Sequence, residues 1–345
     1  MTPAADALAA IGWPADPAAF AQGWAALLAA HPQARPARVV EQHRSGYVVA
    51  DAPGAAATVE SLPEWQRPPG YRRGKVAPED RPVVGDWVLV EAGARIVALL
   101  PRRSAIKRGA AGEHYRQQLI AANIDVVLVV CGLDRDFNPR RIERYLLLVQ
   151  ADGVAPVVVL TKADRDGADV AAARTALAGI AAQGVAVVAV NAKDPASVAV
   201  LDRWLPAGAT AVLVGSSGAG KSTLTNTLLG SERMKTAAVR DHDARGRHTT
   251  THRALIALPT GACLIDTPGM RELKPTGEED LADGGFVDID ALAADCRFRD
   301  CSHLREPGCA VRAAVEAGTL DAARLANYLK LRDEVAAAAH ARRRL

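Results

Sequence analysis

The sequence predicts an α/β protein in which a small β-barrel precedes a mainly parallel sheet and a helical metal-binding module closes the chain. Three observations predict this fold class. Short β-prone runs broken by Gly, Pro and Asp fill residues 36–110. Apolar strand-like runs then alternate with helical segments over residues 111–278. Residues 279–345 hold three of the five cysteines, grouped beside a histidine.

Length and composition set the outer limits. A chain of 345 residues predicts two or three domains, and 49% hydrophobic with 23% charged residues is typical of a well-cored protein. The net charge of +3 permits an RNA partner without arguing for one. Because we find no basic leader and no apolar run of membrane length, we expect a cytoplasmic protein with no membrane partner.

Residues 1–35 form an Ala- and Pro-rich N-terminal extension. Its composition predicts an appendage or a partly disordered arm. One helix is possible over residues 19–30, where Trp24 and Leu27 would share a side.

Residues 36–110 contain five β-prone runs: ARVVEQ, GYVVADA, AATVES, DWVLVEAG and ARIVALL. Five short strands suit an oligonucleotide-binding (OB-fold) barrel that contacts RNA, although any small all-β domain would fit the same pattern. Two basic groups are candidate contacts to an RNA backbone or simply solvated surface. They comprise Arg72, Arg73 and Lys75, and Arg102, Arg103, Lys107 and Arg108.

The sheet of residues 111–278 is predicted from six apolar runs: IDVVLVVC, VAPVVVL, VAVVAV, TAVLVG, ALIAL and ACLID. Near-continuous Val, Ile and Leu indicate strands covered on both faces, which crossover helices provide. Asn138 and Pro139 are placed as the N-cap and first residue of one such helix.

A phosphate-binding loop follows the fourth run, in the sequence GSSGAGKST. The match to G-x-x-x-x-G-K-S lies between a strand and a helix, the context that gives this motif its specificity. Its backbone N–H groups would surround the phosphates, Lys221 would contact the β- and γ-phosphates, and the Ser222 hydroxyl would bind Mg²⁺. The predicted nucleotide contacts here are Gly215, Ser216, Ser217, Gly218, Ala219, Gly220, Lys221, Ser222 and Thr223.

Two further segments would complete the phosphate side. Asp266 ends an apolar strand and is placed to hold Mg²⁺, while the Gly269 amide could contact the γ-phosphate. The alternative is an ordinary acid in a Pro-Gly turn. The run of threonines at 249–251 resembles a switch segment whose hydroxyl binds Mg²⁺, and Thr250 is the favoured ligand. These β-branched residues would otherwise simply begin the next strand.

A guanine-reading corner is predicted at Thr161, Lys162, Ala163 and Asp164, directly after a buried strand. A carboxylate at Asp164 can accept hydrogen bonds from guanine N1–H and the 2-amino group, donors that adenine lacks. The Lys162 stem can lie against the base. Most GTPases have Asn where this chain has Thr161, so the hydroxyl supplies one donor where an amide supplies two. A second base loop is predicted at Asn191, Ala192 and Lys193.

The order of these segments is unusual. Base corner and second base loop precede the phosphate loop, the threonine segment and the metal acid, and rotating that order gives the usual GTPase sequence. Because each segment lies at the carboxyl end of a strand, joining the chain elsewhere preserves the site. The sequence therefore predicts a circularly permuted GTPase domain that binds GTP or GDP with Mg²⁺.

The cysteine group has the spacing C-x4-C-x-H-x5-C. Three thiolates and one imidazole form a closed tetrahedral site typical of one structural Zn²⁺. Unligated cytosolic thiols are the alternative, since an odd cysteine count without a secretion signal argues against disulfides. The predicted ligands are Cys296, Cys301, His303 and Cys309.

Together these residues resemble the ribosome small-subunit-dependent GTPase A family (RsgA, also called YjeQ). The similarity covers about residues 36–335 and includes PVVGDWVLV, LPRRSAIKR, TKAD, GSSGAGKST, GRHTTT, DTPG and the cysteine group. The resemblance implies an N-terminal OB-fold barrel, a permuted GTPase and a C-terminal zinc module. It also implies GTP hydrolysis stimulated by the 30S ribosomal subunit, binding to 16S rRNA and a role in late 30S maturation. We expect a monomer.

The residue that would orient the attacking water is not the usual one. Many GTPases have Gln after the D-x-x-G motif, and this chain has Met270, which cannot orient water. Slow intrinsic turnover is therefore expected. His248 is the candidate for positioning the water, a role to which the resemblance also points, although it could instead pack or contact RNA. Two rivals stay open: an RNA-binding assembly factor that uses GTP as a state marker, and a P-loop ATPase or small-molecule kinase.

Overall fold

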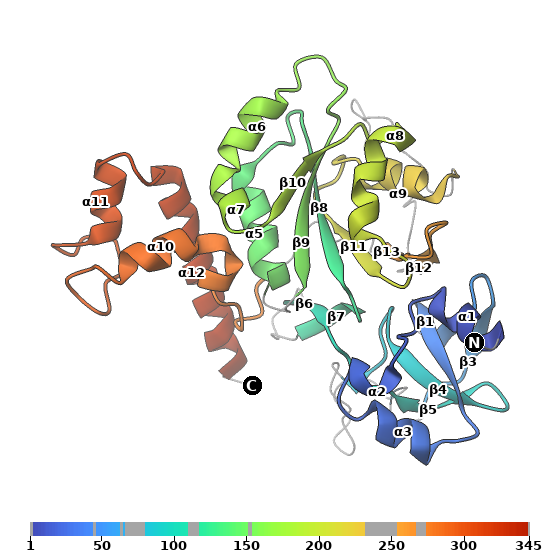
Figure 1. The fold of residues 1–345 in the computed structure, drawn as a ribbon. Helices are drawn as coiled ribbons and strands as arrows, with labels where there is room; N and C mark the ends of the chain where they lie inside the picture. The colour runs from blue at the N-terminus through green and yellow to red at the C-terminus, as the bar shows by residue number, and fades with distance from the viewer. Residues whose placement is uncertain are drawn as a thin grey trace, which may run out of the picture.

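The computed structural model describes residues 3–43, 46–62, 65, 80–109, 117–150, 154–231, 254–266 and 274–343. A β-barrel with N-terminal helices lies below one end of a sheet covered by helices, and a helical module lies on the opposite side (Figure 1). No helix within the described ranges is long and apolar enough to cross a membrane.

The N-terminal segment is folded against the barrel. It contains α1 (Pro3–Ala9), α2 (Pro17–Phe20) and α3 (Trp24–Ala30). Trp24 is fully buried, its ring lies 4.7 Å from that of Phe20, and its Nε1–H donates to the Pro101 carbonyl at 2.7 Å. The expectation of a partly disordered arm is therefore wrong for residues 3–30, which form helices that pack against the barrel. Gly23, with φ of 93°, also splits the single helix expected over residues 19–30.

Five strands form the barrel where the five β-prone runs predicted them. They are β1 (Arg35–His43), β2 (Gly46–Ala50), β3 (Ala56–Val59), β4 (Trp87–Glu91) and β5 (Arg95–Leu99). β1 pairs antiparallel with β2 and β4, β2 with β3, and β4 with β5. A parallel bridge from Glu60 to Arg95 joins the end of β3 to β5 and closes the circuit.

A two-stranded ladder of β6 (Ala105–Gly109) and β7 (Gln117–Ala122) follows the barrel. This ladder crosses the domain boundary predicted at residue 110. The Gly109 amide also donates to the Lys274 carbonyl at 3.0 Å, so the ladder lies against the chain that leads to the C-terminal module.

The central sheet has the order β10-β9-β8-β11-β13-β12, with parallel pairing from β10 to β13 and an antiparallel β12 at one side. Its strands are β8 (Val126–Gly132), β9 (Ala155–Thr161), β10 (Ala186–Ala189), β11 (Thr210–Val214), β12 (Ala254–Ala257) and β13 (Cys263–Asp266). Each coincides with one of the six apolar runs. The predicted mainly parallel sheet is confirmed.

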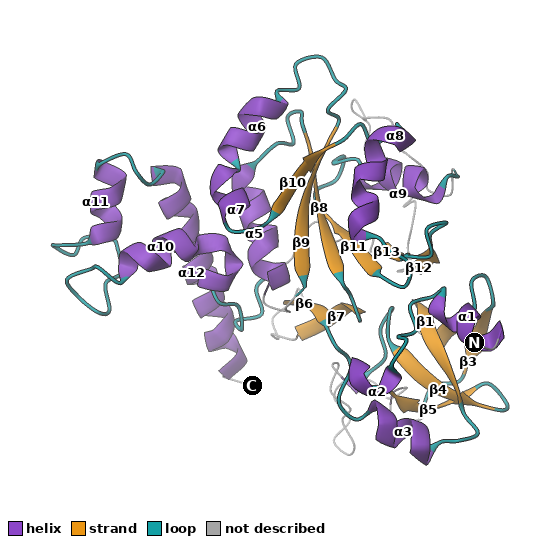
Figure 2. Ribbon diagram, viewed as in Figure 1, coloured by secondary structure: helices purple, strands orange, loops and turns teal. Residues whose placement is uncertain are grey.

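Helices cover both faces of this sheet (Figure 2). One face packs against α5, α6 and α7, and the other against α8, a 3₁₀ segment and α9. Their bounds are α5 (Pro139–Gln150), α6 (Val170–Ala176), α7 (Ala178–Ala182), α8 (Pro195–Val198), the 3₁₀ segment (Ala199–Trp204) and α9 (Lys221–Leu229). The Asn138 Oδ1 accepts from the Arg140 amide at 3.0 Å, which confirms it as the cap of α5.

A buried arginine joins three parts of the chain. Arg38 of β1 is only 1% exposed, and its guanidinium donates to Thr210 Oγ1 at 2.8 Å and to the carbonyls of Gly85 and Asn123 at 3.3 Å. It also donates to the Ile11 carbonyl at 2.5 Å. Since a buried charge is costly unless hydrogen-bonded, these acceptors fix the N-terminal segment and the barrel against the sheet.

The C-terminal module packs on α5. It comprises a π-helical turn (Ala282–Phe286), α10 (Val287–Ala293), α11 (Ala310–Glu316) and α12 (Ala322–Arg343). Leu147 of α5 shares a buried cluster with Phe286 and Val311. Beside it, Arg324 of α12 donates to Glu143 of α5 at 2.8 Å, and both side chains are less than 10% exposed.

Candidate nucleotide site and candidate metal centre

The phosphate-binding motif forms the loop between β11 and α9. Gly215 has φ of 145°, and a Cβ at this position would lie 2.2 Å from the Val130 carbonyl of the neighbouring strand. Gly220 has φ of 95°, a left-handed conformation that glycine adopts at little cost. The two glycines of the motif are therefore required by the close strand contact and by the turn into α9.

Lys221 is the first residue of α9, and its side chain folds back into the phosphate loop. Its ammonium donates to the carbonyls of Gly215 at 2.7 Å and Ser216 at 2.5 Å. Ser217 and Gly218 are exposed at the rim, whereas Ala219 is buried. A cation enclosed by a glycine-rich turn at a helix N-terminus is a site suited to phosphate groups.

The base corner at the end of β9 contacts the phosphate loop directly. Thr161 is fully buried, and its hydroxyl donates to the Ala219 carbonyl at 2.5 Å. A threonine hydroxyl has one hydrogen to donate, and Thr161 uses it to join the base corner to the phosphate loop. Asp164 is exposed at the same corner, where a carboxylate can accept hydrogen bonds from an incoming base.

The second base loop joins the same assembly. The Ala163 amide donates to the Val190 carbonyl at 3.3 Å, and the Lys193 amide donates to the Asn191 side chain at 3.0 Å. From α9, the Thr227 hydroxyl donates to the Ala192 carbonyl at 2.6 Å. The structure therefore brings together all three segments that the sequence separates.

A loop after β8 supplies two acids that sequence reasoning missed. Asp134 Oδ2 lies 2.6 Å from the Lys162 ammonium, and both oxygens of Asp136 accept from the Ser216 hydroxyl, at 2.5 and 2.6 Å. Arg141 of α5 pairs with Asp136 at 2.5 Å. The sequence did contain one signal for Asp134 and Asp136, which is that they directly follow the buried strand β8. Residues after a parallel strand lie at the carboxyl edge of the sheet, where the other loops of the site converge.

The carboxylate of Asp266 ends β13, the strand beside β11. Burial raises the pKa of Asp266, and the nearby Lys221 ammonium partly counteracts this effect. The Asp266 carboxylate and Ser222, the second residue of α9, are available to hold Mg²⁺ with oxygen ligands. His248, Thr249, Thr250, Thr251, Gly269 and Met270 lie outside the described residues.

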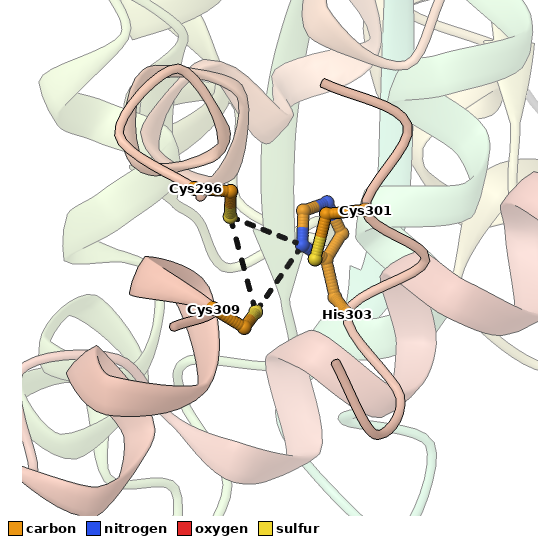
Figure 3. A group of neighbouring side chains, drawn as sticks. All are labelled: Cys296, Cys301, His303 and Cys309. Atoms are coloured by element: carbon orange, nitrogen blue, oxygen red, sulfur yellow. Dashed lines mark hydrogen bonds between the residues drawn. The ribbon is translucent and has the colours of Figure 1, made fainter. Parts of the chain in front are cut away.

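The cysteine group forms a compact cluster between α10 and α11 (Figure 3). The four ligand atoms lie within 4.8 Å of one another. His303 Nδ1 is 3.5 Å from Cys309 Sγ and 3.7 Å from Cys296 Sγ, and the two sulfurs are 3.9 Å apart. Bonds of about 2.3 Å to sulfur and 2.0 Å to nitrogen give tetrahedral edges near 3.5–3.8 Å. The three separations among Cys296, His303 and Cys309 match these edges, and Cys301 lies within 4.8 Å of them, so the residues fit Zn²⁺.

The surroundings of His303 and Cys309 suit metal binding. Burial, followed by the positive charge of Arg332, lowers the pKa of His303 and keeps its imidazole neutral. Cys309 caps α11, where its sulfur accepts from the Arg312 amide at 3.4 Å. Glu306 folds the intervening loop by accepting backbone N–H bonds from Ser302 at 3.0 Å and Leu304 at 3.1 Å.

The basic residues considered for RNA contact fall into different roles. Arg102 is only 16% exposed in its side chain and forms two hydrogen bonds with the buried Asp86, so it stabilises the barrel. Lys107 pairs with Glu278 at 3.3 Å, and Arg108 donates to Gln118. Arg72, Arg73 and Lys75 lie outside the described residues.

Comparisons with known proteins agree with this geometry. The family model described as RsgA GTPase matches residues 99–276. A relative from Xanthomonas campestris pv. campestris (strain B100), named small ribosomal subunit biogenesis GTPase RsgA, is 69% identical over 96% of this chain and 89% of its own. A relative of the same name from Xanthomonas oryzae pv. oryzae (strain PXO99A) is 67% identical over 98% of this chain and 91% of its own.

Two solved structures share the fold. The crystal structure of YloQ, a circularly permuted GTPase, has a TM-score of 0.59 and 24% identity, and covers 88% of this chain and 96% of its own. YjeQ from Thermotoga maritima has a TM-score of 0.59 and 23% identity, with 88% and 98% covered. At these identities the likeness is one of fold.

Proposed function

The chain belongs to the RsgA GTPase family, and from that premise we propose that the 30S ribosomal subunit stimulates its GTP hydrolysis during late maturation of that subunit. The resemblance stated from the sequence, the circularly permuted fold and the assignment as a GTP hydrolase are confirmed. Relatives named for biogenesis of the small ribosomal subunit support that subunit as the partner.

One structural observation carries the proposal most directly. The base corner, encoded before the phosphate loop, is hydrogen-bonded to it through Thr161 and Ala219, and Thr227 joins the second base loop to the helix that follows. A nucleotide whose phosphates lie at Lys221 would therefore meet Asp164 with its base. Asp164 would select guanine through its two donors, and the Lys162 stem would lie against the ring.

The reaction needs charge stabilisation and an oriented water. Lys221 would stabilise charge on the phosphates, and Mg²⁺ held by Ser222, Asp266 and Thr250 would neutralise further charge. The Gly269 amide would contact the γ-phosphate. We assign His248 the positioning of the attacking water, because Met270 offers no group to do so. A His248→Ala protein should bind GDP normally but lose most of its stimulated turnover, and unchanged turnover would remove this assignment.

The other two parts of the chain would hold the ribosomal partner. We assign one structural Zn²⁺ to Cys296, Cys301, His303 and Cys309, where it would fix the loop between α10 and α11. The circuit of five strands closed between β3 and β5 supports an OB-fold barrel, and barrel and metal module together would contact 16S rRNA by charge and shape. The protein would act in the cytoplasm as a monomer.

Multiple-turnover kinetics with purified 30S subunits test the proposal. GTP turnover should be slow alone and should rise in a saturable manner as 30S subunits are added. A flat titration would instead favour an assembly factor that uses GTP as a state marker. Competition by ATP against labelled GDP, where ATP should fail, tests the ATPase or kinase alternative.

A further inference from the structure

An ion pair joins Lys162 of the base corner to Asp134 in the loop after β8. The Lys162 ammonium is 2.6 Å from Asp134 Oδ2, and the two side chains are 15% and 25% exposed. The other oxygen of Asp134 accepts from the Asp136 amide at 3.0 Å, so the backbone of its own loop fixes the carboxylate. Burial would raise the pKa of Asp134, but the bonds from Lys162 and from the Asp136 amide bring it below the ordinary value. The Asp134 side chain is therefore a carboxylate at neutral pH.

Gly132 provides the space for this pair. A Cβ at Gly132 would lie 2.9 Å from the Lys162 ammonium and 2.9 Å from Asp134 Oδ1. Both contacts are with the ends of side chains and not with backbone. An alanine here would displace the ion pair while leaving the strand in place.

Both ends of the Lys162 side chain are thus constrained. Its backbone has φ of 61°, a left-handed conformation that fixes the direction in which the side chain leaves the corner. Asp134 fixes the ammonium at the other end. A free lysine side chain loses rotamer freedom when a ligand packs on it, and a lysine held in advance loses less.

We propose that Asp134 is a positioning residue for nucleotide binding, which holds the Lys162 ammonium over Gly132 so that the lysine stem is extended before the base arrives. The inference rests on the proposed function, since that function assigns Lys162 to the base side. Contacts with the base are the same in the ground state and the transition state, so the effect falls on Kd and KM and leaves kcat unchanged.

The direction in which GDP affinity changes when the Asp134 carboxylate is removed distinguishes a positioning role from a purely electrostatic one. Removing a carboxylate near a polyanionic nucleotide strengthens binding by Coulomb attraction alone. Loss of positioning weakens binding. Asp166, an exposed acid in the same corner, offers a matched control because Asp166→Ala removes the same charge without touching Lys162.

The experiment is a titration of the full-length protein with fluorescent GDP. Asp134→Ala should weaken binding about fivefold, the effect of freeing one long side chain. Asp166→Ala should bind as tightly as the wild type or more tightly. Asp134 Oδ2 also pairs with the half-exposed Arg165 at 3.4 Å. The Asp134→Ala, Lys162→Ala double variant separates the two contacts: it should bind no more weakly than Lys162→Ala alone, because the positioning effect acts through Lys162.

Gly132→Ala gives an independent measurement should Asp134→Ala fold poorly. It should weaken binding to a similar extent while kcat at saturating GTP and 30S stays within about twofold of the wild type. Wild-type affinity in both variants, or additive losses in the double variant, would overturn the positioning role. A wild-type protein that fails to bind fluorescent GDP would contradict the proposed function instead, so the two failures are distinct.

Discussion

Replacing Thr161 by valine tests the bond that joins the two separately encoded halves of the site. Thr161→Val keeps the β-branched shape but removes the hydroxyl that donates to the Ala219 carbonyl at 2.5 Å. Both residues are fully buried, so water cannot replace the lost donor. The Ala219 carbonyl, left as an unsatisfied buried acceptor, costs about 1–3 kcal/mol. Part of this cost is offset because valine has no hydroxyl to desolvate on folding.

A net loss of about 1–2 kcal/mol is expected, shared between the stability of the domain and the geometry of the phosphate loop. This corresponds to a fall in Tm of about 2–8 °C for a domain of this size, and to GDP binding weakened by about tenfold where the loss falls on the loop. Differential scanning fluorimetry and titration with fluorescent GDP measure the two effects.

A matched control is available in α6. Thr175 is exposed, and its hydroxyl donates to the Ala171 carbonyl of the same helix at 3.0 Å. Thr175→Val should change stability by less than about 0.5 kcal/mol, as exposed substitutions do. Thr161→Ser, which keeps the hydroxyl, should retain most of the GDP affinity. If Thr161→Val matches the wild type in both Tm and GDP affinity, the corner does not depend on this bond.

Two further outcomes are expected in the C-terminal module. Removing the metal with a strong chelator should unfold the loop between Cys296 and Cys309 and loosen α10 and α11, the helices that this loop joins. The expected signals are lost helical circular dichroism and release of one Zn²⁺ per chain, while GDP affinity stays within about twofold. A chelated protein with an unchanged melting profile would contradict a structural metal. Glu143→Ala should destabilise the docking of α12 on α5 by about 3 kcal/mol, because Glu143 accepts hydrogen bonds from Arg140, Arg324 and Asn327 at 2.6–2.8 Å. Limited proteolysis of this variant should then release α12 first. Equal proteolysis rates in the variant and the wild type would show that other contacts hold the module.

The sequence predicted the elements whose signal is local. Apolar runs gave the six strands of the sheet, glycine spacing gave the phosphate loop, and Asn138 marked the start of α5. Each of these depends on interactions within a few residues, or on burial that repeats along one strand. The order of the motifs was enough to predict the permutation.

Contacts between distant segments were not predictable in the same way. Residues 1–35 suggested an appendage or a partly disordered arm because they are rich in Ala and Pro, and only the structure shows that Trp24 is buried against the barrel. Arg102 looked like a candidate RNA contact because nothing local links it to its buried partner, Asp86, which lies sixteen residues away directly before β4. Asp134 and Asp136 carried no motif, since their roles depend on Lys162 and Ser216, which lie on other loops.

The preference of Asp164→Asn for xanthine over guanine nucleotides tests most directly whether the upstream corner recognises the base. Xanthine carries a carbonyl where guanine has its 2-amino group, so the asparagine amide can donate to xanthine, whereas the wild-type carboxylate would be repelled. GDP affinity should fall by about 100-fold or more in Asp164→Asn, and XDP should bind better than GDP. A variant that binds GDP as tightly as the wild type, with no gain for XDP, would show that the base lies elsewhere.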